Sequence, residues 1–221
     1  MTTCQCRAAD EEFGAAIASR ELRRFRKRGP NRATRLLLDA VRRVPLPAQP
    51  SLLDVGGGIG AIHHVLLDGG FGGATHIDAS RAYLDVAQEE AERRGHKARV
   101  AFVHGDFHAL AAATPLADVV TLDRVVCCDP DYATLLGAAA DHARHLLALT
   151  YPHDRWFTRL FVTIINGLRR LRGTPFRAYI HPPGAMAAVV EGRGLRRRWT
   201  GGTVVWKVEV YERQRVGVGS P

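Results

Sequence analysis

The stretch that decides the fold lies at residues 51–60, Ser-Leu-Leu-Asp-Val-Gly-Gly-Gly-Ile-Gly. Leu52, Leu53 and Val55 form a short apolar run that is typical of a buried strand. The run breaks into a turn in which glycine recurs at every second position. Such a turn brings bare backbone against a ligand, and a tight strand-to-helix turn without a ligand is the alternative. The rest of the chain decides between the two.

Further apolar segments follow this stretch at the spacing of strands that alternate with helices. They lie at residues 75–78, 100–104, 118–123 and 146–150. The alternation predicts an α/β fold, a doubly wound Rossmann-like parallel sheet with helices on both faces. Right-handed crossovers then bring the C-terminal ends of these strands to one edge. Residues 195–200 and 203–211, joined by Gly201-Gly202, predict a terminal antiparallel hairpin that completes seven strands.

The chain divides into an N-terminal helical arm at residues 1–45, a core at 46–212 and a tail at 213–221. A helical insertion at 154–182 follows the fifth strand of the core and is expected to act as a lid. Asn31 is a plausible N-cap for the second helix of the arm. Residues 20–43 are crowded with arginine, which predicts either a solvated face or an arm that folds over an anionic ligand.

The 221 residues carry a formal net charge of +9, and 46% of them are hydrophobic. This basic balance indicates an anionic partner, which could be nucleic acid, a phosphate, a carboxylate substrate or a membrane surface. No apolar run reaches the length of a transmembrane helix, and no signal-peptide pattern occurs, so a cytoplasmic protein is expected. The four cysteines, Cys4, Cys6, Cys127 and Cys128, do not have the spacing of a disulfide framework or a zinc site, and no metal is predicted.

Residues 31–212 resemble the class I S-adenosylmethionine-dependent methyltransferases. A dehydrogenase also has a glycine turn, but the acid before the glycines and the closing hairpin favour the methyltransferase family. The matching landmarks are the acidic-x-Gly-x-Gly-x-Gly turn, an acid that ends the second strand and a Gly-Asp pair after the third. They correspond to Asp54, Gly56, Gly58 and Gly60, to Asp78, and to Gly105-Asp106.

The resemblance implies S-adenosylmethionine as the cofactor. Gly56 and Gly58 would let the backbone pass close to its methionine part, and Asp54 would hold the ammonium end. Asp78 would accept both ribose hydroxyls in charge-assisted hydrogen bonds.

The same resemblance assigns the adenine site and the end of the fourth strand. Asp106 and Phe107 would bind the adenine edge, with Ala79 and Phe107 as apolar surface. Leu122 and Asp123 lie where a backbone carbonyl meets the cofactor's amine.

Within the family, the Val-Val-x-x-Asp-Arg-Val-x-Cys-Cys stretch at 119–128 is loosely similar to small-molecule methyltransferases related to magnesium-protoporphyrin IX O-methyltransferase. Cys127 and Cys128 stand where many small-molecule members have two histidines, so they are expected to contact substrate. A hydroxyl or amine acceptor would need a base, for which His153 and His181 are the candidates, with Tyr151 beside them. An ionised carboxylate would need none.

The helix expected at residues 154–171 has a broad apolar surface, wider than the narrow stripe of an amphipathic helix. We expect Trp156, Phe157 and Phe161 to contact substrate, while a core or dimer helix and an interfacial membrane helix are the alternatives. The predicted function is methyl transfer to an anionic or partly apolar small molecule by a monomer or homodimer. An RNA methyltransferase that uses the basic arm, and an enzyme that uses the cofactor for other chemistry such as cyclisation, are the alternative functions. Against RNA, the Asn/Asp-Pro-Pro-Tyr signature of base-amino methylation is missing.

Overall fold

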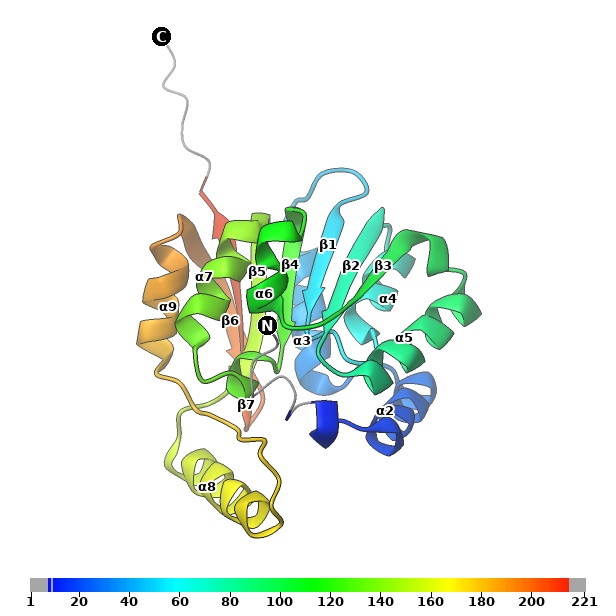
Figure 1. The fold of residues 1–221 in the computed structure, drawn as a ribbon. Helices are drawn as coiled ribbons and strands as arrows, with labels where there is room; N and C mark the ends of the chain where they lie inside the picture. The colour runs from blue at the N-terminus through cyan, green and yellow to red at the C-terminus, as the bar shows by residue number, and fades with distance from the viewer. Residues whose placement is uncertain (1–7, 9, 215–221) are drawn as a thin grey trace.

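The computed structural model describes residues 8 and 10–214, and a seven-stranded sheet forms its centre (Figure 1). The strand order is β3-β2-β1-β4-β5-β7-β6, and β7 runs antiparallel to both of its neighbours. This confirms the predicted α/β fold with its terminal hairpin. The strands are β1 (Ser51–Val55), β2 (Gly73–Asp78), β3 (Val100–His104), β4 (Ala117–Asp123), β5 (Ala143–Pro152), β6 (Leu195–Gly202) and β7 (Trp206–Arg213).

Helices cover both faces of the sheet because adjacent residues of each central strand point in opposite directions. In β1, Leu53 packs with α7 (Tyr132–His142) and α9 (Pro183–Glu191), whereas Leu52 packs with α3 (Arg32–Arg42) and α4 (Ala61–Asp68). The crossover after β2 is α5 (Arg81–Arg94), and α6 (Phe107–Leu110) follows β3. Each crossover returns the chain so that the parallel strands end at the same edge.

The N-terminal arm is helical, as predicted. Within the arm, α2 (Ala15–Arg28) packs on α5 by placing Leu22 and Phe25 against Tyr83. Asn31 caps α3, since its side-chain oxygen accepts from two backbone amides of the first turn, and this confirms the predicted cap. Cys4, Cys6 and most of the predicted tail lie outside the described residues.

The hairpin turn differs from the prediction. Gly201 and Gly202 lie inside β6, and the chain turns at residues 203–205, where the Thr203 amide donates to the Trp206 carbonyl at 2.7 Å. A β-carbon on Gly201 would overlap the ring of Trp199, so this glycine makes room for an indole and does not form the turn. The sequence alone does not distinguish a Gly-Gly pair that forms a turn from one that makes room for a neighbouring ring.

A buried carboxylate joins the antiparallel strand to the parallel part of the sheet. Glu209 of β7 has no exposed surface, and it accepts hydrogen bonds from the hydroxyls of Tyr151 and Tyr211, each at 2.8 Å. It also pairs with Lys207 at 2.7 Å and with Arg197 at 3.3 Å. Burial alone would raise the pKa of Glu209, but these donors outweigh it and hold the pKa below its usual range.

Replacing Glu209 with glutamine removes the charge while the two cationic partners stay. We expect Glu209→Gln to lower the free energy of unfolding at pH 7 by about 3 kcal/mol, as for a broken buried ion pair. Because the folded pKa is lowered, the wild-type advantage is present above about pH 4.5 and fades on acidification. Urea unfolding followed by circular dichroism measures this. The exposed variant Glu212→Gln is the control, and equal stability of the two variants would contradict the assignment.

Candidate functional site

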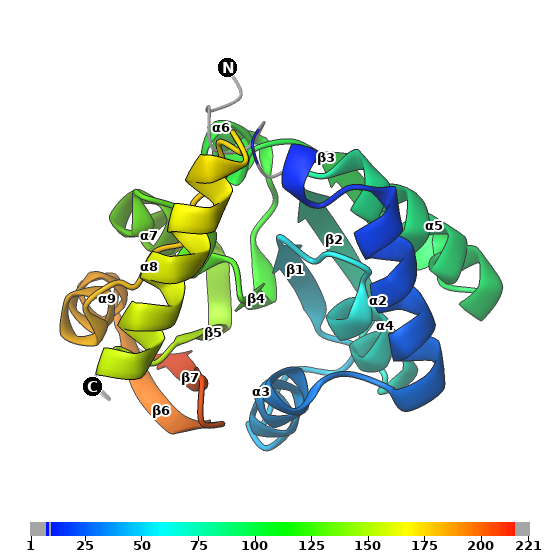
Figure 2. The same ribbon diagram turned by 90° about the horizontal axis from the view of Figure 1, so that it is seen from below.

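A cavity of about 400 Å³ lies at the edge where the parallel strands end. The glycine turn after β1 and the ends of β2 and β4 form its floor, and the arm closes one side through Glu21, Arg24 and Phe25. The segment after α8 (Trp156–Leu171) supplies further lining. Seen toward this edge, α2 and α8 flank the strand ends on opposite sides (Figure 2). The basic arm therefore does fold over the candidate site, although most of its arginines face solvent.

The glycine turn is held in a backbone conformation that favours glycine. Gly56, Gly58 and Gly60 have φ values of 61°, 57° and 78°, in the left-handed region. A β-carbon on Gly56 would also come within 2.5 Å of the Val125 side chain. Gly56 and Gly58 line the cavity, as the predicted cofactor role requires, whereas Gly60 is not part of the described lining.

Gly57 is a constraint that the sequence analysis missed. A β-carbon at this position would lie 2.6 Å from the His76 ring and 2.7 Å from Asp54 Oδ2. Both neighbours have no exposed surface. The only signal in the sequence was that Gly57 stands between two other glycines, and the side chains that require it, Asp54 and His76, lie on different strands.

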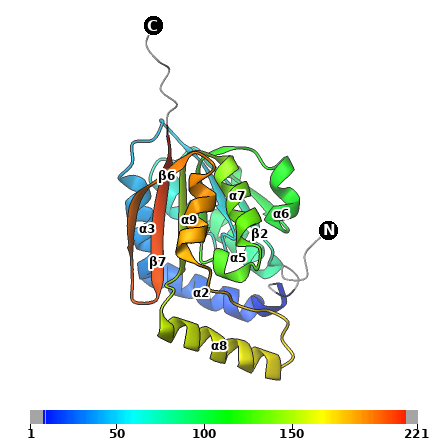
Figure 3. The same cartoon turned by 90° about the vertical axis from the view of Figure 1, so that its left-hand side faces the viewer.

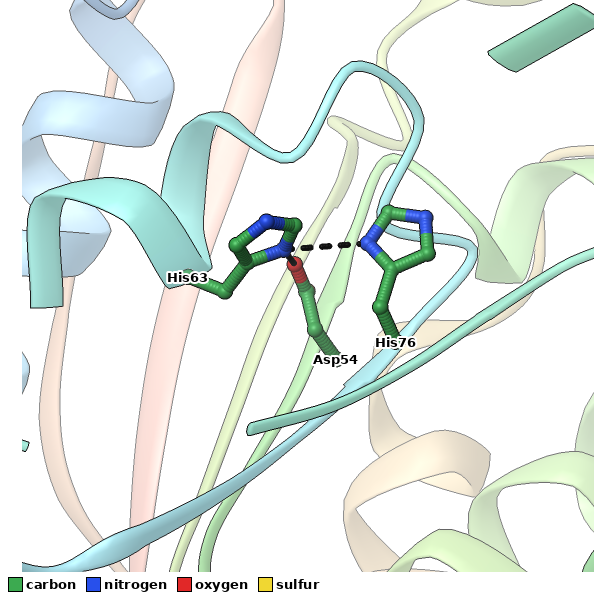
Figure 4. A group of neighbouring side chains, drawn as sticks. All are labelled: Asp54, His63 and His76. Atoms are coloured by element: carbon green, nitrogen blue, oxygen red, sulfur yellow. Dashed lines mark hydrogen bonds and ion pairs between the residues drawn. The ribbon is translucent and has the colours of Figure 1, made fainter. Parts of the chain in front are cut away.

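Asp54, His63 and His76 form a buried cluster beneath the turn (Figure 4). His63 Nδ1 lies 3.0 Å from His76 Nδ1 and 3.7 Å from Asp54 Oδ2, so one imidazole donates to the other. Burial raises the pKa of Asp54 to about 6 and lowers the pKa of each histidine to about 3, which keeps both imidazoles neutral at pH 7. Their ligand atoms lie within 4.8 Å of one another and could hold a metal ion; the absence of a metal stays a prediction.

Asp78 ends β2 at the wall of the cavity. Its Oδ2 accepts from the Gly58 amide and its Oδ1 from the Ser80 amide, both at 2.8 Å. Each carboxylate oxygen has two acceptor sites, so both keep capacity for a ligand hydroxyl. Burial raises the pKa of Asp78 to about 6. Ala79 lines the cavity next to it, as predicted for a residue that contacts the cofactor.

The other residues predicted to bind the cofactor divide into two groups. Asp123 lines the cavity and accepts from the Thr34 hydroxyl at 2.5 Å, a contact between the arm and β4 that the sequence did not indicate. Leu122 and Phe107 are buried in the core, and Asp106 accepts from the His108 amide at the start of α6. None of these three belongs to the described lining of the cavity.

Arg124 is a second residue that the sequence analysis missed. It follows β4 on the cavity wall with φ of 65°, which is unusual for a residue with a side chain. Its amide donates to the Thr150 carbonyl at 3.0 Å, and its own carbonyl accepts from the thiols of Cys127 and Cys128 at 3.3 and 3.5 Å. These contacts on both sides of the residue stabilise the strained backbone.

Cys127 and Cys128 line the cavity, and the sequence analysis predicted that they contact substrate. Their sulfur atoms lie 4.0 Å apart. The hydrogen bond between them lowers the pKa of Cys127, with a further contribution from Arg124, and raises the pKa of Cys128. Cys127 is therefore the more acidic thiol of the pair.

The three predicted catalytic residues do not reach the described lining of the cavity. His153 Nε2 donates to the Thr203 carbonyl at 3.1 Å, and His181 Nε2 donates to the Val126 and Asp129 carbonyls at 3.1 and 2.9 Å. Tyr151 donates to Glu209 in the core, as described above. Each of these three side chains donates a hydrogen bond to a backbone carbonyl or to a buried carboxylate. The sequence alone does not distinguish a residue with this structural role from a catalytic residue.

The structure places the predicted lid contacts away from the described lining of the cavity. Trp156 and Phe161 are 77% and 58% exposed, and Phe157 is half-buried; none of them is in the described lining. The insertion reaches the cavity through Arg169, Phe176 and Ala178 instead. The Arg169 guanidinium lies 4.7 Å from the centre of the Phe176 ring.

Comparison with known proteins agrees with this fold. A family model described as a methyltransferase domain matches residues 52–145. None of the curated protein sequences compared with the chain matches it significantly.

Among solved structures, magnesium protoporphyrin IX methyltransferase from Synechocystis PCC 6803 with bound SAH has a TM-score of 0.72 and 18% identity, and the match covers 95% of this chain and 100% of that one. An O-methyltransferase family protein from Burkholderia thailandensis has a TM-score of 0.65 and 17% identity over 83% of this chain and 57% of that one. The [4+2]-cyclase SpnF has a TM-score of 0.62 and 14% identity over 81% and 80%.

These findings confirm the predicted fold, enzyme class and cofactor. Structures similar to this chain hold S-adenosylmethionine or its product, S-adenosylhomocysteine. Residues 52–145 form a methyltransferase domain, and the chain has the fold of the class I S-adenosylmethionine-dependent methyltransferases.

Proposed function

We propose that this enzyme transfers a methyl group from S-adenosylmethionine to a carboxylate of a partly apolar small molecule. The observation that carries the proposal is the chemistry of the cavity wall. Arg24 and Arg169 line it, and no histidine belongs to its described lining. The cavity thus offers cations for an anionic acceptor, and its described lining lacks an imidazole, the commonest base for a hydroxyl or amine acceptor, although carboxylates such as Glu21 and Asp129 also line it.

The donor set fits the cofactor on two observations. Asp78 turns a buried carboxylate with spare acceptor sites toward the cavity, which suits a pair of ribose hydroxyls. Gly58 lines the cavity, and the space where a side chain would stand is open, with Tyr83 no nearer than 3.9 Å. The cofactor supplies a methyl group that its sulfonium has already activated. The chain's own contribution is to hold the acceptor oxygen in line and to exclude water.

A carboxylate acceptor matches the arginines in charge and shape. Carboxylic acids are ionised at neutral pH, so their oxygens already carry the lone pair that attacks a methyl group. A guanidinium can bind a second carboxylate, or orient the first, through paired hydrogen bonds.

The rest of the wall favours a substrate with an apolar body. Phe13, Phe25, Ile59 and Phe176 line the cavity beside the arginines. The Synechocystis neighbour is a methyltransferase of magnesium protoporphyrin IX, which is itself a small molecule.

RNA methylation stays as a second candidate because α2 exposes Arg20, Arg23, Lys27 and Arg28 to solvent. Phosphate contacts through these residues would make RNA binding strongly salt-dependent.

The linkage formed by the transferred methyl group tests the proposed acceptor. We expect that incubation with methyl-labelled S-adenosylmethionine and an extract of acidic, partly apolar metabolites gives label that mild alkali releases as volatile methanol. Only a methyl ester hydrolyses in this way. Alkali-stable label in small molecules would point to ethers or N-methyl products and contradict the carboxylate, and label in added RNA would support the second candidate. Methylthioadenosine in place of S-adenosylhomocysteine would indicate other chemistry.

The protonation of Asp78 predicts how cofactor binding varies with pH. Protonation near pH 6 removes the negative charge that accepts two hydroxyls, so affinity for S-adenosylhomocysteine should fall as pH drops from 7.5 to 5.5. Asp78→Asn should weaken binding at pH 7.5 by about 100-fold, the size expected for lost charged hydrogen bonds, and should flatten this pH dependence. Calorimetry measures both. The exposed variant Asp85→Asn should bind like wild type, and an unchanged Asp78→Asn would exclude the assigned role.

Arg24 provides a test of the substrate side. We expect Arg24→Gln to raise the KM for a carboxylate substrate at least 10-fold, since one charged hydrogen bond contributes about 1.5 kcal/mol or more. Its affinity for S-adenosylhomocysteine should stay within about twofold. Arg23→Gln is the matched control, because Arg23 is an exposed residue of the same helix outside the described lining. Equal KM values for the two variants would contradict the role of Arg24.

A further inference from the structure

Helix α8 presents its faces in the reverse of the usual order. Its polar residues Asn166 and Arg169 face the protein: the Asn166 amide pairs with both backbone groups of Ala178 at 2.8 and 3.0 Å, and Arg169 pairs with Glu12 at 2.7 Å. Phe157, Val162 and Ile165 are half-buried, and the other large apolar residues of the helix face solvent. They recur three or four positions apart, on one side of the helix, and are Trp156, Leu160, Phe161, Ile164, Leu168 and Leu171, each at least 48% exposed.

The turn between β6 and β7 adds to this apolar surface. Val204 and Val205 are 70% and 39% exposed, and the Val205 carbonyl accepts from the His153 amide at 2.8 Å, shortly before α8 begins. Nine large hydrophobic residues are exposed in the described part of the chain, and eight of them belong to α8 or this turn. Contiguous apolar surface of this kind marks a contact site, whereas scattered exposed residues do not.

The charges around the stripe indicate what it contacts. Helix α8 contains no acidic residue. Arg155, Arg170 and Arg172 are exposed at its two ends, and Arg159 pairs with Asp154 through two hydrogen bonds. Apolar side chains, an interfacial tryptophan and flanking arginines are the pattern of a helix that lies in the headgroup region of an anionic bilayer. A second copy of the chain would bring arginines toward arginines.

We propose that α8, with the turn at residues 203–205, docks this protein on the surface of an anionic lipid bilayer. The helix would lie parallel to the membrane plane with its apolar stripe in the headgroup boundary. In the described part of the chain no helix is both long and apolar enough to cross a membrane, so the contact is peripheral.

The position of α8 fits this contact. It projects at the end of the molecule where the parallel strands terminate, and α2 lies at the same end (Figure 3). The exposed basic residues of α2 therefore belong to a helix that lies at the same end of the molecule as α8. Each cationic residue near an anionic bilayer adds to the attraction, and salt weakens it.

Vesicle flotation tests the proposal with the full chain. We expect binding to vesicles of 70% phosphatidylcholine and 30% phosphatidylserine that falls at least 10-fold on pure phosphatidylcholine and declines with added salt. Replacing two residues of the stripe, Leu160→Glu with Ile164→Glu, should abolish binding while affinity for S-adenosylhomocysteine stays at the wild-type value. That readout shows that the variant is folded, and it does not depend on the substrate.

The matched control is Leu116→Glu. Leu116 is 49% exposed and lies just before β4, at the end of the sheet where the parallel strands begin, opposite α8. This variant should bind vesicles like wild type. Three results would overturn the proposal: no binding of wild type to anionic vesicles, equal loss in Leu116→Glu, or a wild-type dimer in solution that the double variant converts to monomer. The last result would assign the stripe to a second copy.

Discussion

The close approach of the Gly57 backbone to Asp54 and His76 is the constraint on which the site depends. The turn can follow β1 only because the residue above these two buried side chains has no β-carbon. The cluster in turn pairs polar atoms across β1, β2 and α4, and Thr121 of β4 donates to Asp54, whereas Asp54 Oδ2 and the Nε2 atoms of His63 and His76 have no hydrogen-bond partner among the described residues. The turn, the Asp78 carboxylate that binds the Gly58 amide and the floor of the cavity thus form one connected unit.

Two accessory segments build on this unit in different ways. The arm packs as an ordinary amphipathic element, with Leu22 and Phe25 inward and arginines outward, and it reaches the end of β4 through the Thr34–Asp123 hydrogen bond. The insertion is attached by polar contacts at Asn166 and Arg169. Hydrophobic burial fixes the first segment, whereas the second combines these hydrogen bonds with a single buried ring, that of Phe176. This difference is why one completes the core and the other leaves an apolar surface uncovered.

Much of the fold could be predicted from the sequence because its signals are local. The strand rhythm, the Asn31 cap and the acid that ends β2 each depend on a few neighbouring residues. The rest of the site, apart from the glycine turn, depends on which residues that are far apart in the sequence come into contact in the fold. The positions of His153 and His181 in the sequence suggested catalytic bases, yet each imidazole donates to a backbone carbonyl. The helical spacing of the α8 stripe was visible, but spacing does not say whether an apolar face points inward or outward.

The insertion of β7 between β5 and β6 also has a consequence for how the chain folds. The edge of β5 has no partner until residues Trp206–Arg213 have been synthesised, and the Glu209 network closes at the same step. A nascent chain with β1 to β5 complete would expose an apolar strand edge of the kind that invites aggregation. Completion of the sheet is therefore delayed until its last strand has left the ribosome, and protection of that edge during synthesis becomes a requirement for a good yield of folded protein.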